Sequence, residues 1–239
     1  MRRVAFLVLF LAALVFVRCK KSSSPTNHTP TAVPADTVIH ITSLSALSVE
    51  ADSLSTCQIT VQLDPTTTPR DNFVIFSTTL GQFPNGLNTD TSAVNVYGVA
   101  VLPLLSNIAG SAFVSARVDG ILVDTTVSFT PALPDGMFCV ANPYVGADSV
   151  DFHIACDLYR DQGRGKVSDP IQVLFSFLPA TGNYNAPALI LPPVANSIAG
   201  VVTDSVQNPY HNTGNFVIVA TTTLANGNPL STPIILVIN

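Results

Sequence analysis

A hairpin motif at residues 110–129 restricts the fold more than any other feature of this sequence. The segment reads GSAFVSARVDGILVDTTVSF, and Asp119-Gly120 at its centre favours a two-residue type I′ turn between antiparallel strands. Such a turn pairs Val118 with Ile121, and it fixes which side chains share a face. One face is then almost entirely apolar: Ala112, Val114, Ala116, Val118, Ile121, Val123, Thr125, Val127 and Phe129. A sheet with one apolar face needs a second sheet packed on it.

The composition also favours strands over helices. Hydrophobic residues make up 47% of the 239 residues, charged residues only 10%, and the Thr- and Val-rich mixture suits strands and turns. The formal net charge of −5 comes without a basic patch. This charge excludes a nucleic-acid-binding surface as a plausible function.

The first residues are typical of an exported protein. Arg2 and Arg3 precede an apolar run from Val4 to Val17, which is short for a membrane span and suited to the core of a secretory signal. A helix that is apolar all round would have nothing to pack against in a sandwich. We therefore expect residues 1–18 to be a signal peptide.

The leader is followed by Cys19 and a polar stretch, CKKSSSPTNHTPTAVPAD, with little capacity to fold. A leader, a Cys and a flexible tether (residues 19–37) resemble a bacterial lipoprotein precursor, although Arg18 stands where that family has a small residue. The resemblance implies that Cys19 carries a lipid that anchors the protein to a membrane of the cell envelope. Lys20, in place of an inner-membrane Asp signal, favours the outer membrane and leaves the facing side open. A plain secreted form is the alternative.

Short strand patterns separated by turn signals fill residues 38–131. The expected strands are residues 38–41, 44–49, 55–63, 73–78 and 99–105, followed by the hairpin. In the stretch 55–63, Cys57, Ile59 and Val61 alternate with polar residues. About seven short strands of this kind are typical of a β-sandwich.

Four stretches resemble the invasin/intimin type of bacterial immunoglobulin-like domain. They are ADSLSTCQITVQL, FVIFSTTLGQF, YGVAVLPLLSNIAGSAFVSARVDG and DTTVSF, in the order that the family shows. Ser53 stands where the family often has Gly, and residues 64–70 replace its usual turn. The resemblance implies an all-β, immunoglobulin-like antiparallel sandwich over residues 38–131.

The same pattern recurs after a short Pro- and Gly-containing linker at residues 130–136. Ala147-Asp148-Ser149-Val150 matches Ala51-Asp52-Ser53-Leu54, and Val173 to Ser176 matches Val74 to Ser77. Asn226-Gly227 then precedes a closing strand. We expect a second, diverged immunoglobulin-like sandwich over residues 137–239, so that the chain holds two in tandem.

The cysteines beyond Cys19 have two readings. Cys57 and Cys156 fall on the expected inward face of a strand, where each can serve as a small core residue. Export makes a disulfide between Cys139 and Cys156 the alternative, with Cys57 left free. The alternation of Cys139 with Phe138 and Val140 favours an outward-pointing Cys139.

Catalytic, metal and cofactor sites have little support in the sequence. His28, His40, His153 and His211 lie at no metal-ligand spacing, and no nucleophile elbow or phosphate loop is present. Carboxylates such as Asp157 and Asp161 can bind calcium between domains, but basic neighbours favour a plain turn. We expect a non-catalytic protein without a metal or cofactor.

Two functions agree with these expectations: an adhesion or interaction module or spacer, and a glycan-binding accessory lipoprotein. The partner is then an unknown protein or glycan. We expect the outward sheet faces to be polar and the loops to carry recognition. The candidate contact residues lie in two loops of the second sandwich: Tyr184, Leu189, Tyr210 and His211. Apolar loop residues that fold back onto the core are the alternative.

Overall fold

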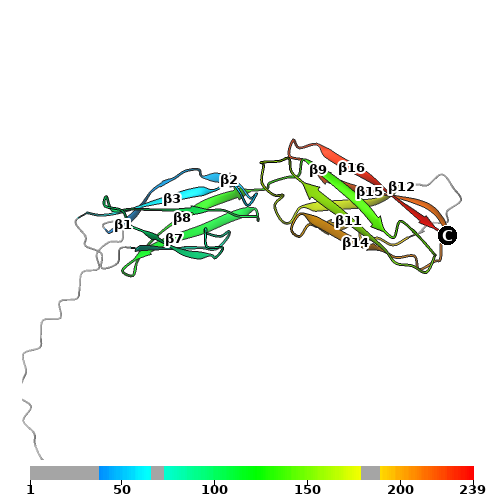
Figure 1. The fold of residues 1–239 in the computed structure, drawn as a ribbon, viewed down its shortest axis with the longest axis horizontal. Helices are drawn as coiled ribbons and strands as arrows, with labels where there is room; N and C mark the ends of the chain where they lie inside the picture. The colour runs from blue at the N-terminus through cyan, green and yellow to red at the C-terminus, as the bar shows by residue number, and fades with distance from the viewer. Residues whose placement is uncertain (1–37, 66–72, 179–188) are drawn as a thin grey trace, which may run out of the picture. The chain divides into compact units, whose positions relative to one another are not determined.

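The computed structural model describes residues 38–65, 73–178 and 189–239, which form strands and their connections (Figure 1). The predicted leader, Cys19 and the tether lie outside these residues. Within the described ranges, no helix is long and apolar enough to cross a membrane.

The first sandwich contains eight strands in two sheets. They are β1 (Ile39–Leu44), β2 (Ser48–Glu50), β3 (Cys57–Leu63), β4 (Phe73–Thr78), β5 (Thr89–Ala93), β6 (Val99–Leu104), β7 (Gly110–Val118) and β8 (Ile121–Thr130). One sheet has the order β1-β3-β6 and the other the order β2-β8-β7-β4-β5.

The second sandwich repeats this topology strand for strand. Its strands are β9 (Gly136–Asn142), β10 (Val145–Gly146), β11 (Phe152–Tyr159), β12 (Gln172–Leu178), β13 (Val194–Asn196), β14 (Val201–Val206), β15 (Gly214–Thr223) and β16 (Pro229–Ile238). The sheets are β14-β11-β9 and β10-β16-β15-β12-β13. In both sandwiches the short second strand pairs in parallel with the last strand, and the other pairings are antiparallel. The two tandem immunoglobulin-like sandwiches expected from the sequence are confirmed.

The hairpin of β7 and β8 has the predicted register. Val118 pairs with Ile121 and Ala112 with Val127. Asp119 and Gly120 have φ angles of 47° and 84°, which is the left-handed backbone that a type I′ turn requires. The inward residues of β7 are buried up to the turn, whereas those of β8 are half-buried from Ile121 to Thr125 and buried at Val127 and Phe129.

Each sandwich has its own core, built from the inward residues of its strands. In the first core, Cys57, Ile59 and Val61 of β3 are fully buried, and the rings of Phe76 and Phe83 pack with their centroids 6.3 Å apart. The second core contains the corresponding inward residues of β11, which are Phe152, Ile154, Cys156 and Leu158. Strict alternation places four side chains of each of these two central strands in its core.

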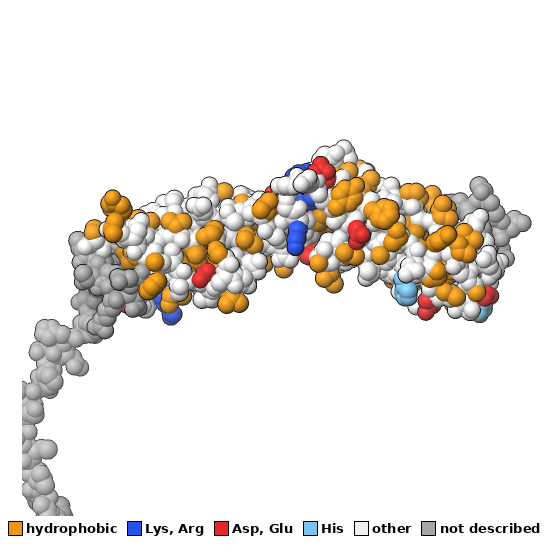
Figure 2. Space-filling view, viewed as in Figure 1, with side chains coloured by type: hydrophobic (Ala, Val, Ile, Leu, Met, Phe, Trp, Pro, Cys, Tyr) orange, Lys and Arg blue, Asp and Glu red, His pale blue; other side chains and the backbone are white. Residues whose placement is uncertain are grey.

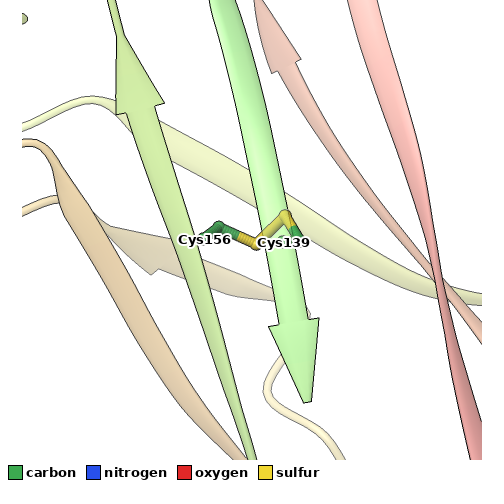
Figure 3. The surroundings of a disulfide bond; sticks show 2 residues. All are labelled: Cys139 and Cys156. Atoms are coloured by element: carbon green, nitrogen blue, oxygen red, sulfur yellow. A yellow bond between two sulfur atoms is a disulfide. The ribbon is translucent and has the colours of Figure 1, made fainter.

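Cys139 and Cys156 form a disulfide that joins β9 directly to β11 (Figure 3). The expectation that Cys139 points outward is wrong, because the alternation of β9 runs the other way and exposes Phe138 and Val140. Cys57, at a comparable inward position on β3, is a free and buried thiol whose Sγ lies 3.1 Å from the backbone oxygen of Ala46.

Residues of the two sandwiches contact each other around Arg160, which lies just after β11. The fully buried side chain of Arg160 places Nη2 2.7 Å from Oε2 of Glu50 and Nη1 3.6 Å from Oδ2 of Asp52. The backbone N–H of Lys166 donates to the carbonyl oxygen of Asp52 at 2.7 Å. Gly165 is needed here, because a Cβ at this position would lie 2.6 Å from the same carbonyl oxygen.

On two edge strands, an Asp side chain accepts a hydrogen bond from the backbone N–H of the next residue. The N–H of Thr91 on β5 donates to Oδ1 of Asp90, and the N–H of Ser205 on β14 donates to Oδ1 of Asp204, both at 2.7 Å. Asp204 lies between two buried Val residues on the inward side of β14, and its Oδ2 is buried without a hydrogen-bond partner. Inward-pointing charges of this kind hinder strand addition at a sheet edge.

Candidate partner-binding surface

The predicted contact residues of the second sandwich do not form a single exposed group. Tyr184 lies outside the described residues. Leu189 is only 6% exposed and packs into the second core, so its prediction as a contact residue is wrong. The apolar side chain returns to the core because this end of the loop is fixed by two backbone hydrogen bonds between Ile190 and Gln207.

Tyr210 and His211 are exposed, and the same bonds place their loop beside residues 189–191. Tyr210 is 60% exposed. His211 lies beside Asp148, with Nδ1 3.3 Å from Oδ2. The loop is further held by Asn208, whose amide nitrogen donates to the carbonyl oxygen of Asp148 at 3.1 Å. A contact role for Tyr210 and His211 stays a prediction.

The structure reveals a larger surface on the outward side of the β14-β11-β9 sheet, which we call the aromatic face. It is formed by side chains of three neighbouring strands: Phe138, Val140 and Asn142 of β9; His153, Ala155, Asp157 and Tyr159 of β11; and Val201, Thr203 and Ser205 of β14. Phe138 is 60% and Tyr159 52% exposed. The expectation of polar, featureless sheet faces is therefore wrong for this sheet.

Tyr159 owes its position to the glycine opposite it. Gly136 is its cross-strand partner, and a Cβ at Gly136 would lie 2.2 Å from both Cζ and Oη of Tyr159. The phenol ring therefore lies across the β9 backbone, at the place where any other residue would hold a side chain. Phe138 follows two positions later on the same side of β9, so the two aromatic residues are neighbours on the surface.

Polar groups lie farther along the same face. Asp157 is paired with Phe138 on one side and Val201 on the other. The ring Nδ1 of His153 lies 3.0 Å from the hydroxyl oxygen of Ser205. The small side chain of Ala155 leaves an open depression of about 540 Å³, lined by Val140, Asn142, His153, Ile154, Ala155, Thr203, Asp204 and Ser205.

The other sheet of the second sandwich also exposes apolar side chains, without charged residues among the outward positions of β12, β15 and β16. The most exposed are Leu174, Leu178, Val194 and Ile235. Figure 2 shows hydrophobic side chains distributed over the visible surface with few charged ones between them. Of the two sheets of the second sandwich, as far as the structure describes them, the aromatic face is the one whose outward positions combine exposed aromatic rings with several polar groups.

The described residues contain no group of three or more His, Cys, Asp or Glu side chains that could hold a metal ion. Calcium at Asp157 and Asp161 was expected to be less favoured than a plain turn. Two basic residues near them contact other carboxylates: Arg160 contacts Glu50 and Asp52, and Arg164 contacts Asp135. Asp161 instead uses its backbone N–H to donate to the carboxylate of Asp135.

The aromatic face could have been found only with the strand register in hand. Phe138 and Tyr159 are far apart in the sequence, and Gly136 carries no signal of its own as a linker residue. The one local signal was the alternation of Phe138 and Val140 in a strand whose Cys139 then has to face inward. The two orientations of that strand differ by a shift of one residue.

Comparisons with solved structures agree with the fold. The adhesin InvE of Yersinia pseudotuberculosis matches with a TM-score of 0.55 and 16% identity, over 84% of this chain and 60% of that one. Invasin, described as a bacterial integrin-binding protein, matches with a TM-score of 0.40 and 18% identity, over 85% of this chain and 40% of that one. The chain thus spans about 60% of the length of InvE.

A fragment of intimin, solved with the intimin-binding domain of its translocated receptor, matches with a TM-score of 0.32 and 20% identity, over 84% of this chain and 64% of that one. No protein-family model matches the chain, and no curated protein matches it. The fold resemblance to invasin/intimin-type immunoglobulin-like domains, predicted from the sequence, is confirmed.

Proposed function

We propose that this protein is a non-catalytic adhesion or interaction module of the bacterial cell envelope, with the second sandwich as its binding domain and the first as its spacer. The observation that carries the proposal is the aromatic face. Large exposed aromatic side chains dominate binding hot spots, and on this face two of them lie on paired strands beside polar groups. The likeness of the fold to the adhesin InvE supports the same function.

The proposal includes export and a lipid on Cys19, which would hold the protein at a membrane, by preference the outer one. The support is the order of leader, Cys and polar tether in the sequence. Metabolic labelling with palmitate in a diderm bacterium tests this part. We expect label on the wild-type chain and none on the Cys19→Ala variant; an unlabelled wild type would contradict the anchor.

The binding function is tested with the full chain on beads, incubated with intact bacterial and host cells. We expect retention of cells by the wild type and loss of retention by Phe138→Thr plus Tyr159→Thr, two changes that keep β-compatible residues. The matched control is Val101→Thr, an exposed position of the corresponding sheet in the first sandwich. If the double variant retains cells as well as the Val101→Thr control does, the aromatic face is not the binding surface.

The loop residues offer a second position for the contact. Tyr210→Ala tests it separately, because Tyr210 is exposed and lies at a loop instead of a sheet face. If only this variant loses retention, the binding site lies at the end of the second sandwich.

A further inference from the structure

We propose that the aromatic face binds a neutral oligosaccharide, with Phe138 and Tyr159 as stacking residues and Asp157, His153, Asn142 and Ser205 as hydrogen-bonding residues. This inference rests on the proposed function and deepens it, because it names the class of ligand that the interaction module takes. Three properties of the face support this class of ligand: exposed aromatic rings, a row of polar groups and the signs of the charges.

Both rings are exposed, and the ring of Tyr159 is supported by the strand beneath it. Tyr159 lies across Gly136, so one side of the phenol covers the strand while half of the residue remains open to solvent. The C–H groups on one side of a sugar ring are weakly positive and apolar, and an aromatic face is negative at its centre. A pyranose placed on Tyr159 or Phe138 therefore meets a complementary surface.

The polar groups follow the rings along β11. From Tyr159 to His153 the strand is about 20 Å long, which gives room for several sugar units. A sugar presents many hydroxyl groups, each of which needs a partner if binding removes it from water. Asp157 offers acceptors, Asn142 both donors and acceptors, and the contacting His153 and Ser205 a mixed pair.

The depression over Ala155 lies between these two groups of residues. It is lined by Val140 and Thr203 at its sides, and it opens to solvent. Because Ala155 is small, a ligand stacked on the rings can continue toward His153 without meeting a bulky side chain. The face is therefore an extended groove-like surface suited to a chain of sugars.

The charged residues of the aromatic face favour a neutral sugar over an anionic ligand. The aromatic face contains Asp157 and no Lys or Arg, so it offers no cation for a carboxylate, sulfate or phosphate. The acidic character of the whole chain acts in the same direction.

The edge of the sheet argues against a peptide as the ligand. A peptide would most readily bind as an added strand, through free backbone groups at an edge. On β14 the N–H of Ser205 is already occupied by Asp204, and the inward carboxylate hinders pairing. At the β14 edge, the observations therefore disfavour an added strand and favour ligand contact through side chains on the face.

The test is binding of the full chain to neutral polysaccharides (glucan, mannan and xylan) and to an anionic one, alginate, by calorimetry with defined oligosaccharides of the best binder. We expect a neutral ligand, and a loss of affinity of more than about tenfold for Phe138→Thr plus Tyr159→Thr. Val101→Thr should bind as the wild type does. Melting temperatures identify a variant that fails to fold, and Asp157→Asn, nearly isosteric, then provides the second test with a smaller loss.

Three results would overturn the inference: binding of alginate alone, neutral-sugar binding that none of the face variants weakens, or no sugar binding at all. The last result leaves the proposed function intact if cell retention still depends on Phe138 and Tyr159, since the partner is then a protein. If neither sugar binding nor retention is observed, the proposed function fails with it.

Discussion

The three-stranded sheets of the two sandwiches have the same topology and opposite surfaces. In the first, the outward residues of β1 and β3 are His40, Thr42, Gln58, Thr60 and Gln62, which are polar. In the second, the matching strands β9 and β11 present Phe138, Val140 and Tyr159 beside Asp157. The inward alternation is the same in both sheets, so the fold leaves the outward residues free to differ. For these two sheets, the difference agrees with the contact role proposed for the second sandwich.

The central strands also treat their inward cysteine differently. Cys156 is bonded to the neighbouring strand, and Cys57 is a packed thiol. The disulfide ties together the two strands that carry Phe138 and Tyr159. A binding face gains from such support, because ordering of its side chains on binding opposes affinity. A spacer has no comparable need.

The largest expected effect comes from emptying one core at a time. Phe76 and Phe152 are both fully buried in their own sandwich. Phe76→Ala and Phe152→Ala should each lower the free energy of unfolding by about 3–5 kcal/mol. Hydrogen exchange in denaturant measures this for each sandwich separately. If either variant lowers protection equally in both halves, the two cores unfold as one unit and the comparison loses its basis.

Removal of the disulfide should have the next largest effect. Cys139 and Cys156 are 17 residues apart, and closing a loop of this size stabilises a fold by about 3 kcal/mol. Cys139→Ala plus Cys156→Ala should lower the melting temperature of the second sandwich and make it insensitive to dithiothreitol. Cys57→Ala, the matched control, should retain the wild-type response to the reductant. A first sandwich that responds to dithiothreitol would contradict this difference.

A smaller effect is expected from acid at the contact around Asp52. Burial raises the pKa of this carboxyl, but the N–H groups of Ser55 and Leu54, the Ser55 hydroxyl and Arg160 outweigh it and hold the pKa below its ordinary value of 3.8. The ionised form thus stabilises the folded chain above that value, and this contribution is lost as the pH falls through 3.8 toward the lower folded pKa.

Denaturant unfolding between about pH 6 and pH 3 measures the contribution of Asp52. We expect Asp52→Asn to weaken the loss of stability in acid. Asp124→Asn, on the exposed side of β8, is the control for removal of one formal charge. An unchanged pH profile for Asp52→Asn would show that the contact with Arg160 adds no acid sensitivity.

The smallest effect should also be equal in both sandwiches. Gly120 and Gly227 each lie in the turn of the last hairpin of their sandwich. Their φ angles are 84° and 81°, and no atom lies within 4 Å of the position that a Cβ would take. Gly120→Ala and Gly227→Ala should each lower the free energy of unfolding by about 1 kcal/mol, from backbone strain alone. Asn at either site should cost less, because it tolerates the left-handed region. Unequal values would indicate that the two turns are not equivalent.

The fold was predictable wherever a strand or turn has a clear local pattern in the sequence. Asp119-Gly120 predicted the register of β7 and β8, and the alternation from Cys57 to Leu63 predicted the core side of β3. The short strands β5, β10 and β13 were missed, because edge strands bury little and show weak patterns. The predicted orientation of Cys139 was wrong because β9 carries apolar residues on both faces, so its alternation does not show which face is inward.

The surfaces were harder to predict, since they depend on which strands become neighbours. Tyr159 faces Gly136 only after β9 and β11 pair, and Arg160 finds Glu50 across 110 positions of sequence. Leu189 was assigned to a contact surface because its loop looked apolar, whereas its pairing with residues near Gln207 buries it. Side-chain chemistry was visible in the sequence, and its juxtaposition was not.

Asp90 and Asp204 have a consequence for many copies of the chain together. If many copies are anchored side by side on a membrane, neighbouring molecules meet one another often. At such crowding, open strand edges would join one molecule to the next into ribbons. Each of these two carboxylates occupies the N–H of the following residue on an edge strand, Thr91 on β5 and Ser205 on β14. In a dense layer of this protein, these two carboxylates therefore oppose edge-to-edge association through β5 and through β14, the strand that borders the aromatic face.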